Sequence, residues 1–128
     1  MPTHVLVADD EPHIGRIIQT KLEQGPFRVT LVADGTRAMR ALEEYPDVAL
    51  VLLDLMMPGL SGLEVLAQMR GDERWKALPC VILTAAGHDQ QREEALRLGA
   101  NDFMTKPFSP KRLYARVAEL TAGDAAPA

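Results

Sequence analysis

Runs of apolar residues alternate along this chain with segments in which apolar residues recur every three or four positions. The longest run, Val48 to Leu53, leads directly into Asp54. A continuous apolar run of this length, rich in branched side chains, predicts a strand that is buried on both faces of a parallel sheet. Pro58 and Gly59 then end any regular structure. We therefore expect Asp54 at the point where a central strand passes into a loop.

Shorter apolar runs predict four more strands, at residues 4–8, 28–32, 80–84 and 102–105. Helices are expected between and after the strands, and capping or breaking residues mark their boundaries: Pro12, Asp34, a Ser61–Glu64 capping box, Gly99 and the Ser109–Pro110 pair. Strands and helices therefore alternate five times. This alternation indicates right-handed βαβ crossovers and an α/β fold whose parallel sheet is covered on both faces.

Apolar stripes predict which side of each helix meets the sheet. The residues expected to face inward include Ile14, Ile17, Ile18 and Leu22 in the first helix, Leu63, Leu66 and Ala67 in the third, and Leu113, Val117 and Leu120 in the fifth. Tyr114 and Ala118 would then lie on the outer side of the fifth helix. Trp75 is expected to anchor the polar loop 71–76 against the third helix.

Composition narrows the class of protein. The chain has 128 residues, which fits one domain, and 47% of them are apolar. Its net charge of −4 gives no electrostatic footprint for nucleic acid or an anionic membrane surface. There is no apolar run of about 18 residues to span a bilayer and no signal-peptide pattern at the N-terminus. The single cysteine, Cys80, cannot form an internal disulfide, so the cytoplasm is the expected compartment.

Polar side chains end or follow four of the predicted strands. Asp9 and Asp10 follow the first strand, Asp54 the third, Thr84 ends the fourth, and Lys106 follows the fifth. The carboxyl ends of parallel strands lie at one edge of a sheet, which is where ligands bind in α/β folds. We therefore expect these residues to converge there, although Asp9 and Asp10 could simply cap the first helix.

This set of side chains favours a particular chemistry. Three crowded carboxylates repel one another unless a cation neutralises them. The chain has no Cys/His set suited to zinc, whereas oxygen ligands suit Mg²⁺. A carboxylate beside Mg²⁺, a lysine and a hydroxyl are the groups needed to transfer a phosphoryl group to an aspartate.

The same residues carry a resemblance that covers positions 3–121. The chain resembles the receiver domains of two-component response regulators in four segments: Asp9-Asp10, the run from Asp54 to Gly62 (DLMMPGLSG), Thr84-Ala85, and Lys106-Pro107-Phe108, with Gly99 to Phe103 before the lysine. The resemblance implies a flavodoxin-like, doubly wound sheet in the order 2-1-3-4-5 with five helices. It also implies a receiver domain at 1–121 and a flexible tail or linker start at 122–128.

The resemblance implies the role of each site residue. Asp54 would accept a phosphoryl group from a phosphohistidine on a partner histidine kinase or phosphotransfer protein, and Lys106 and Thr84 would contact that group. The ligands implied for Mg²⁺ are Asp9 (in support), Asp10, Asp54 and the backbone carbonyl of Met56. A cis peptide bond is common in the family at the position of Lys106–Pro107.

The resemblance further implies a switch rather than an enzyme. On phosphorylation Thr84 would move toward the phosphoryl group, and the aromatic residue Phe103 would turn inward. The surface of the fourth helix, fifth strand and fifth helix would be the output face, for a downstream effector, an output domain of a longer chain or a phosphorylation-dependent homodimer. The expected chemistry is limited to self-phosphorylation and autodephosphorylation.

Three alternative functions require other residues or other chemistry. A dehalogenase-like phosphatase needs a second acid close after the nucleophile, but Leu55 and Met56 follow Asp54. A flavin-binding module needs a phosphate loop after the first strand, where the acidic run 9–11 would repel a phosphate ester. A pseudo-receiver that binds a partner without phosphorylation remains the alternative.

Overall fold

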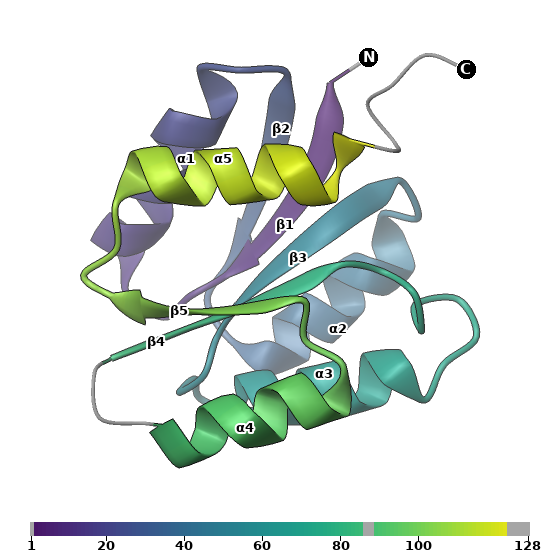
Figure 1. The fold of residues 1–128 in the computed structure, drawn as a ribbon. Coiled ribbons are helices and arrows are strands. Elements are labelled where there is room, and N and C mark those ends of the chain that lie inside the picture. Colours follow the sequence, from purple (N-terminus) through teal and green to yellow (C-terminus); the bar gives the residue numbers. More distant parts are fainter. Residues whose placement is uncertain (1, 86–88, 123–128) are drawn as a thin grey trace.

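A five-stranded parallel sheet forms the centre of the computed structural model, which describes residues 2–85 and 89–122 (Figure 1). The strands are β1 (Thr3–Ala8), β2 (Phe27–Val32), β3 (Val48–Asp54), β4 (Cys80–Ala85) and β5 (Asp102–Lys106). They are ordered β2-β1-β3-β4-β5, and all four pairings are parallel. The predicted doubly wound α/β fold is therefore confirmed. The expected tail, 122–128, lies almost entirely outside the described residues.

Within the described residues, five helices cover the sheet in two layers (Figure 1). They are α1 (Pro12–Glu23), α2 (Gly35–Glu44), α3 (Gly62–Arg70), α4 (Asp89–Leu98) and α5 (Pro110–Leu120). α1 and α5 lie on one face, and α2, α3 and α4 lie on the other. The central strand β3 supplies side chains to both cores, and residues 50–53 are fully buried. No helix among the described residues is long and apolar enough to cross a membrane.

The predicted helix boundaries are confirmed by their caps. Ser61 and Glu64 form a reciprocal capping box, with the Ser61 amide donating to Glu64 over 2.9 Å. The Asp34 carboxylate accepts from the Arg37 amide over 2.8 Å. Gly99 adopts a φ of +107°, which favours glycine. The Lys106–Pro107 peptide bond is cis, as the family resemblance implied.

Two predicted inward-facing residues are exposed. In α1 the side packed on the sheet is Gly15, Ile18 and Leu22, and Ile17 is 44% exposed. The Cβ of a residue at 15 would lie 3.3 Å from the Leu31 side chain, so helix and sheet approach closely there. Gly15 thus faces the sheet together with Ile18 and Leu22, and Ile17 lies outside this buried face.

In α3 the buried face also differs from the predicted apolar stripe, and Ala67 is exposed. The buried residues of this helix are Gly62, Val65, Leu66 and Met69. Val65 and Met69 are larger than Ala67, so this arrangement buries more apolar surface.

The predicted outward position of Tyr114 is wrong. Its ring is half-buried and meets Phe27 edge-on, with ring centroids 5.5 Å apart. A Cβ at Gly25 would lie only 1.9 Å from the Tyr114 hydroxyl, so Gly25 makes room for the ring. Ala118 packs against the same core. α5 packs against α1, and this side of α5 therefore belongs to the interior.

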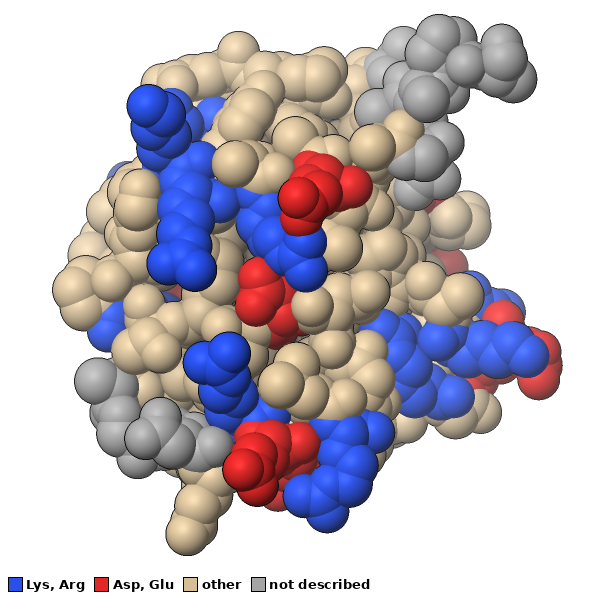
Figure 2. Space-filling view, in the orientation of Figure 1, with Lys and Arg blue, Asp and Glu red and all other residues tan. Residues whose placement is uncertain are grey.

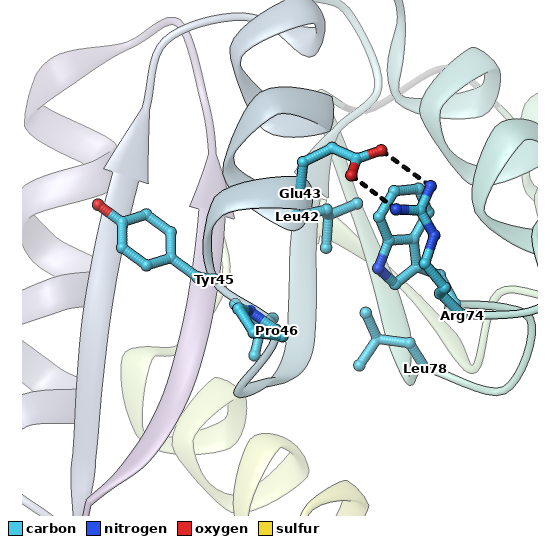
Figure 3. A pocket seen from close by; sticks show the side chains of 8 residues that line it. Leu42, Glu43, Tyr45, Pro46, Arg74 and Leu78 are labelled. Carbon is cyan, nitrogen blue, oxygen red and sulfur yellow. Dashed lines mark hydrogen bonds and ion pairs between the residues drawn. The ribbon is translucent and has the colours of Figure 1, made fainter.

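Trp75 anchors its loop, as predicted, and borders a hollow at the edge of the sheet opposite Asp54 (Figure 3). The hollow has a volume of about 400 Å³. The Arg74 guanidinium lies 4.1 Å from the centre of the Trp75 ring, and its nitrogens lie 2.6 and 2.8 Å from the Glu43 carboxylate. Arg70 donates to the Trp75 carbonyl over 3.0 Å. These contacts fix the loop to α2 and α3.

We expect Gly62→Ala to destabilise the fold. A Cβ at Gly62 would lie 2.4 Å from the Asp54 carbonyl oxygen, so α3 would have to move away from the end of β3. The expected loss in the free energy of unfolding is about 1–3 kcal/mol, measured by urea denaturation. Gly71→Ala is the matched control, because its Cβ would meet the Ala67 carbonyl at an ordinary 3.5 Å. Equal losses for the two variants would contradict this account.

Candidate functional site

The predicted convergence of polar side chains is observed at the carboxyl edge of the sheet. Asp54 is the last residue of β3, Asp9 follows β1, and Lys106 is the last residue of β5. The Lys106 Nζ atom lies 3.0 Å from Asp9 Oδ2 and 3.3 Å from Asp54 Oδ2. Three strands thus bring an ammonium and two carboxylates into direct contact.

Four carboxylates surround this point. Asp9, Asp10, Glu11 and Asp54 each offer an oxygen atom, and these atoms lie within 4.8 Å of one another. Asp9 and Asp54 are buried, each only 5% exposed, whereas Asp10 and Glu11 are exposed. The buried pair has little water to solvate its charges and depends on neighbouring cations.

Glu11 is the site residue that the sequence analysis missed. Its Oε1 atom lies 3.0 Å from Lys106 Nζ, so it shares the ammonium with Asp9 and Asp54. The only signal in the sequence was its place in the acidic run 9–11, directly after a strand. That run does not show whether a third acid turns toward the sheet edge or into solvent.

Backbone hydrogen bonds orient the two buried carboxylates. The Glu11 amide donates to Asp9 Oδ1 over 2.9 Å, and the Met56 amide donates to Asp54 Oδ1 over 3.4 Å. In each residue this leaves Oδ2 as the atom that faces Lys106. The loops after β1 and β3 therefore direct the Oδ2 atoms of Asp9 and Asp54 toward Lys106 Nζ.

Burial and charge shift the pKa values of the site. Burial, followed by repulsion from Asp9, raises the pKa of Asp54 from 3.8 to about 7, although Lys106 opposes this shift. Burial lowers the pKa of Lys106, but the hydrogen bond with Glu11 and the contacts with the Asp9 and Asp54 carboxylates outweigh it, and the net shift is upward. The hydrogen bond from Lys106 lowers the pKa of Glu11. The Asp54 carboxyl group thus holds a proton readily unless more positive charge reaches it.

The acidic cluster could hold a metal ion. Asp9 Oδ2 is buried and, within the described part of the chain, accepts no hydrogen bond of regular geometry, although Lys106 lies beside it. A set made only of oxygen atoms suits a hard cation such as Mg²⁺. The donors present therefore fit the cation that the sequence predicted.

Thr84 lies on β4 opposite Thr105 of β5, and Phe103 of β5 lies opposite Ile82. Thr84 is buried, and among the described residues its hydroxyl has no hydrogen-bond partner. A buried hydroxyl without a partner is costly and is suited to accept or donate a bond when a ligand arrives. Phe103 is 7% exposed and packs in the core beneath α2, α3 and α4. Met56 is 63% exposed beside Asp54.

Comparison with known proteins agrees with this geometry. The family model described as the response regulator receiver domain matches residues 5–118. The chain is 41% identical over 114 residues to the uncharacterized transcriptional regulatory protein YkoG of Bacillus subtilis, covering 89% of this chain and 49% of the relative. It is 39% identical over 118 residues to the phosphate regulon transcriptional regulatory protein PhoB of Escherichia coli, covering 91% and 51%. The chain thus spans about half the length of these curated relatives.

Among solved structures, the receiver domain of the Francisella response regulator 1452 has a TM-score of 0.87 and 33% identity. That match covers 95% of this chain and 98% of the other. The match to the family model extends over most of the chain and includes every residue brought together at the carboxyl edge of the sheet. The chain therefore belongs to the response regulator receiver domain family.

Proposed function

We propose that residues 1–121 form a receiver domain that accepts a phosphoryl group on Asp54 from a phosphohistidine of a partner histidine kinase or phosphotransfer protein. The observation that carries the proposal is the contact set of Asp54: a buried carboxylate 3.3 Å from an ammonium and beside three other carboxylates. The cytoplasmic location expected from the sequence is part of the same proposal.

In the proposed reaction an oxygen of the Asp54 carboxylate attacks phosphorus. The phosphorus–nitrogen bond of the phosphohistidine breaks, and its electron pair leaves with the imidazole. Lys106 donates to a phosphoryl oxygen, and the Thr84 hydroxyl donates to another. Mg²⁺, when held by Asp9, Asp10, Asp54 and the backbone carbonyl of Met56, would neutralise charge on the phosphoryl oxygens. The chain itself would act as a phosphoacceptor, with autodephosphorylation as its only turnover.

The proposed output follows from the same contacts. A hydrogen bond between Thr84 and the phosphoryl group would satisfy a hydroxyl that has no partner among the described residues. Phe103 is already packed inward, which is the position assigned to it in the activated state. A ligand that favours one arrangement of β4 and β5 shifts the population toward it.

The proposed output face is formed by α4, β5 and α5, and both basic and acidic side chains are spread over it (Figure 2). Arg116 on α5 lies 2.8 Å from Asp102 on β5 and also pairs with Glu119. Charged pairs of this kind can exchange partners with a second surface. A downstream effector, an output domain of a longer chain or a second copy could bind there.

A pseudo-receiver that binds without phosphorylation is not favoured. The acidic positions, the lysine and the hydroxyl are all present, and Lys106 contacts both buried carboxylates.

Treatment with acetyl phosphate and Mg²⁺ tests the phosphoacceptor. We expect a mass gain of one phosphoryl group in the wild type and none in Asp54→Asn, because the amide is not a nucleophile toward phosphorus. Asp47→Asn, just before the other end of β3, is the matched control and should keep the adduct. Intact-mass spectrometry provides the measurement. A wild type that gains no mass, or an adduct that persists in Asp54→Asn, would contradict the proposal.

The stability of the protein should depend on pH and on Mg²⁺ through the Asp54 carboxyl group. Because the folded-state pKa of Asp54 is raised from 3.8 to about 7, the folded, metal-free protein binds more protons than the unfolded chain between these values. Its free energy of unfolding should therefore fall relative to Asp54→Asn as the pH rises from about 4 to about 7. At pH 8 in EDTA we expect the Tm of Asp54→Asn to exceed that of the wild type by about 3 °C or more.

Adding Mg²⁺ at pH 8 should reverse this order, because the cation stabilises the ionised carboxylate of the wild type and has one ligand fewer in the variant. Thermal denaturation followed by circular dichroism gives both values. The account would be wrong if the two proteins kept the same difference in Tm at pH 5 and pH 8.

A further inference from the structure

Three carboxylates surround the Lys106 ammonium, and it donates hydrogen bonds to two of them, Glu11 and Asp54. Its Nζ atom lies 3.0 Å from Glu11 Oε1, 3.0 Å from Asp9 Oδ2 and 3.3 Å from Asp54 Oδ2. An ammonium has three N–H donors, and the contact with Asp9 is an ion pair without regular hydrogen-bond geometry. An incoming phosphoryl oxygen therefore competes with these carboxylates, Glu11 included, for the charge and the N–H donors of Lys106.

The three partners differ in the cost of their release. The side chain of Asp9 is fully buried and that of Asp54 is 7% exposed, whereas that of Glu11 is 48% exposed. A buried carboxylate that loses its cation remains unsolvated, but water can replace the ammonium at Glu11. The Glu11 contact is therefore the one that opens most readily.

The position of Glu11 at the start of α1 also indicates that its side chain interacts with Lys106 and not with the helix. Glu11 is the N-cap residue of this helix, but its side chain makes no capping hydrogen bond. Its carboxylate instead reaches across to Lys106, 95 positions along the chain. A glutamate is also a less usual N-cap than aspartate, asparagine or serine. The helix thus gains no cap from Glu11, and the contact made by its carboxylate is with the site lysine.

We propose that Glu11 is a positioning residue that holds Lys106 in a resting arrangement, and that this ion pair competes with the phosphoryl donor for Lys106. The inference rests on the proposed function of Asp54. Glu11 slows phosphoryl transfer in this arrangement, because it occupies a donor of Lys106 and adds negative charge where an anionic phosphoryl group approaches. The chemical step is unchanged: Asp54 attacks phosphorus, and the leaving group departs with the electron pair of the broken bond.

Two variants separate the contact from the charge. Glu11→Gln removes the negative charge and weakens the contact with Lys106. Glu11→Asp keeps the charge but shortens the side chain by one methylene, so its carboxylate no longer reaches Lys106 Nζ. Glu44→Gln, at the exposed C-terminal end of α2, is the matched control for the change in net charge.

The experiment measures the rate of phosphorylation against the concentration of acetyl phosphate at saturating Mg²⁺. We expect the maximal rate to rise about two- to fivefold in both Glu11→Gln and Glu11→Asp, which is the effect of releasing an exposed ion pair. The half-saturating concentration should fall only in Glu11→Gln, where the repelling charge is lost. Glu44→Gln should match the wild type in both quantities.

Labelling with an amine-reactive reagent gives a readout that does not depend on phosphorylation. Modification of Lys106, quantified by peptide mass spectrometry relative to the exposed Lys111, should increase in both Glu11 variants. Unchanged maximal rates and unchanged labelling in both variants would overturn this inference while an adduct on wild-type Asp54 upheld the proposed function. Absence of the wild-type adduct would overturn both.

Discussion

The repulsion between two buried carboxylates, and the lysine that offsets it, is the constraint on which the site depends. Asp9 and Asp54 are each 5% exposed, and Lys106 lies within 3.3 Å of both. Without a neighbouring cation this pair would have to take up a proton or open to water. Lys106 supplies one positive charge to three carboxylates, and this excess of carboxylates suits a divalent cation. Burial is the main cause of the raised pKa of Asp54, and repulsion from the Asp9 carboxylate raises this pKa further.

The parallel sheet makes this arrangement possible. The ends of β1, β3 and β5 lie at one edge because every strand runs in the same direction. The cores on both faces of the sheet hold the strands in fixed register, with Val51 opposite Cys80 and Ala85 opposite Lys106. Gly62 allows α3 to begin against the carbonyl of Asp54, so the loop after Asp54 is packed closely. The sheet thus supports side chains at the ends of β3 and β5 and in the loop after β1.

The sequence was sufficient to predict the strands and helices and most of the residues of the candidate site. Every predicted strand lies within two residues of the observed strand, because long apolar runs and capping residues are local signals. The proximity of Asp9, Asp54 and Lys106 could be predicted, since each ends or follows a strand of a parallel sheet. The rotation of α1 and α3 could not be predicted in the same way. Ile17 and Ala67 lie at the borders of apolar stripes, and close approach to the sheet decides which border is buried.

What the sequence determined by itself is the order of strands and helices and the edge at which the polar residues gather. Only the tertiary structure decided which acids share the lysine, that Tyr114 packs against Phe27 rather than facing outward, and that Glu11 joins the site. The physical reason is the separation along the chain of the residues that interact. Strand and helix signals act between residues a few positions apart, whereas the Glu11–Lys106 contact joins positions 95 apart and depends on the packing of everything between them.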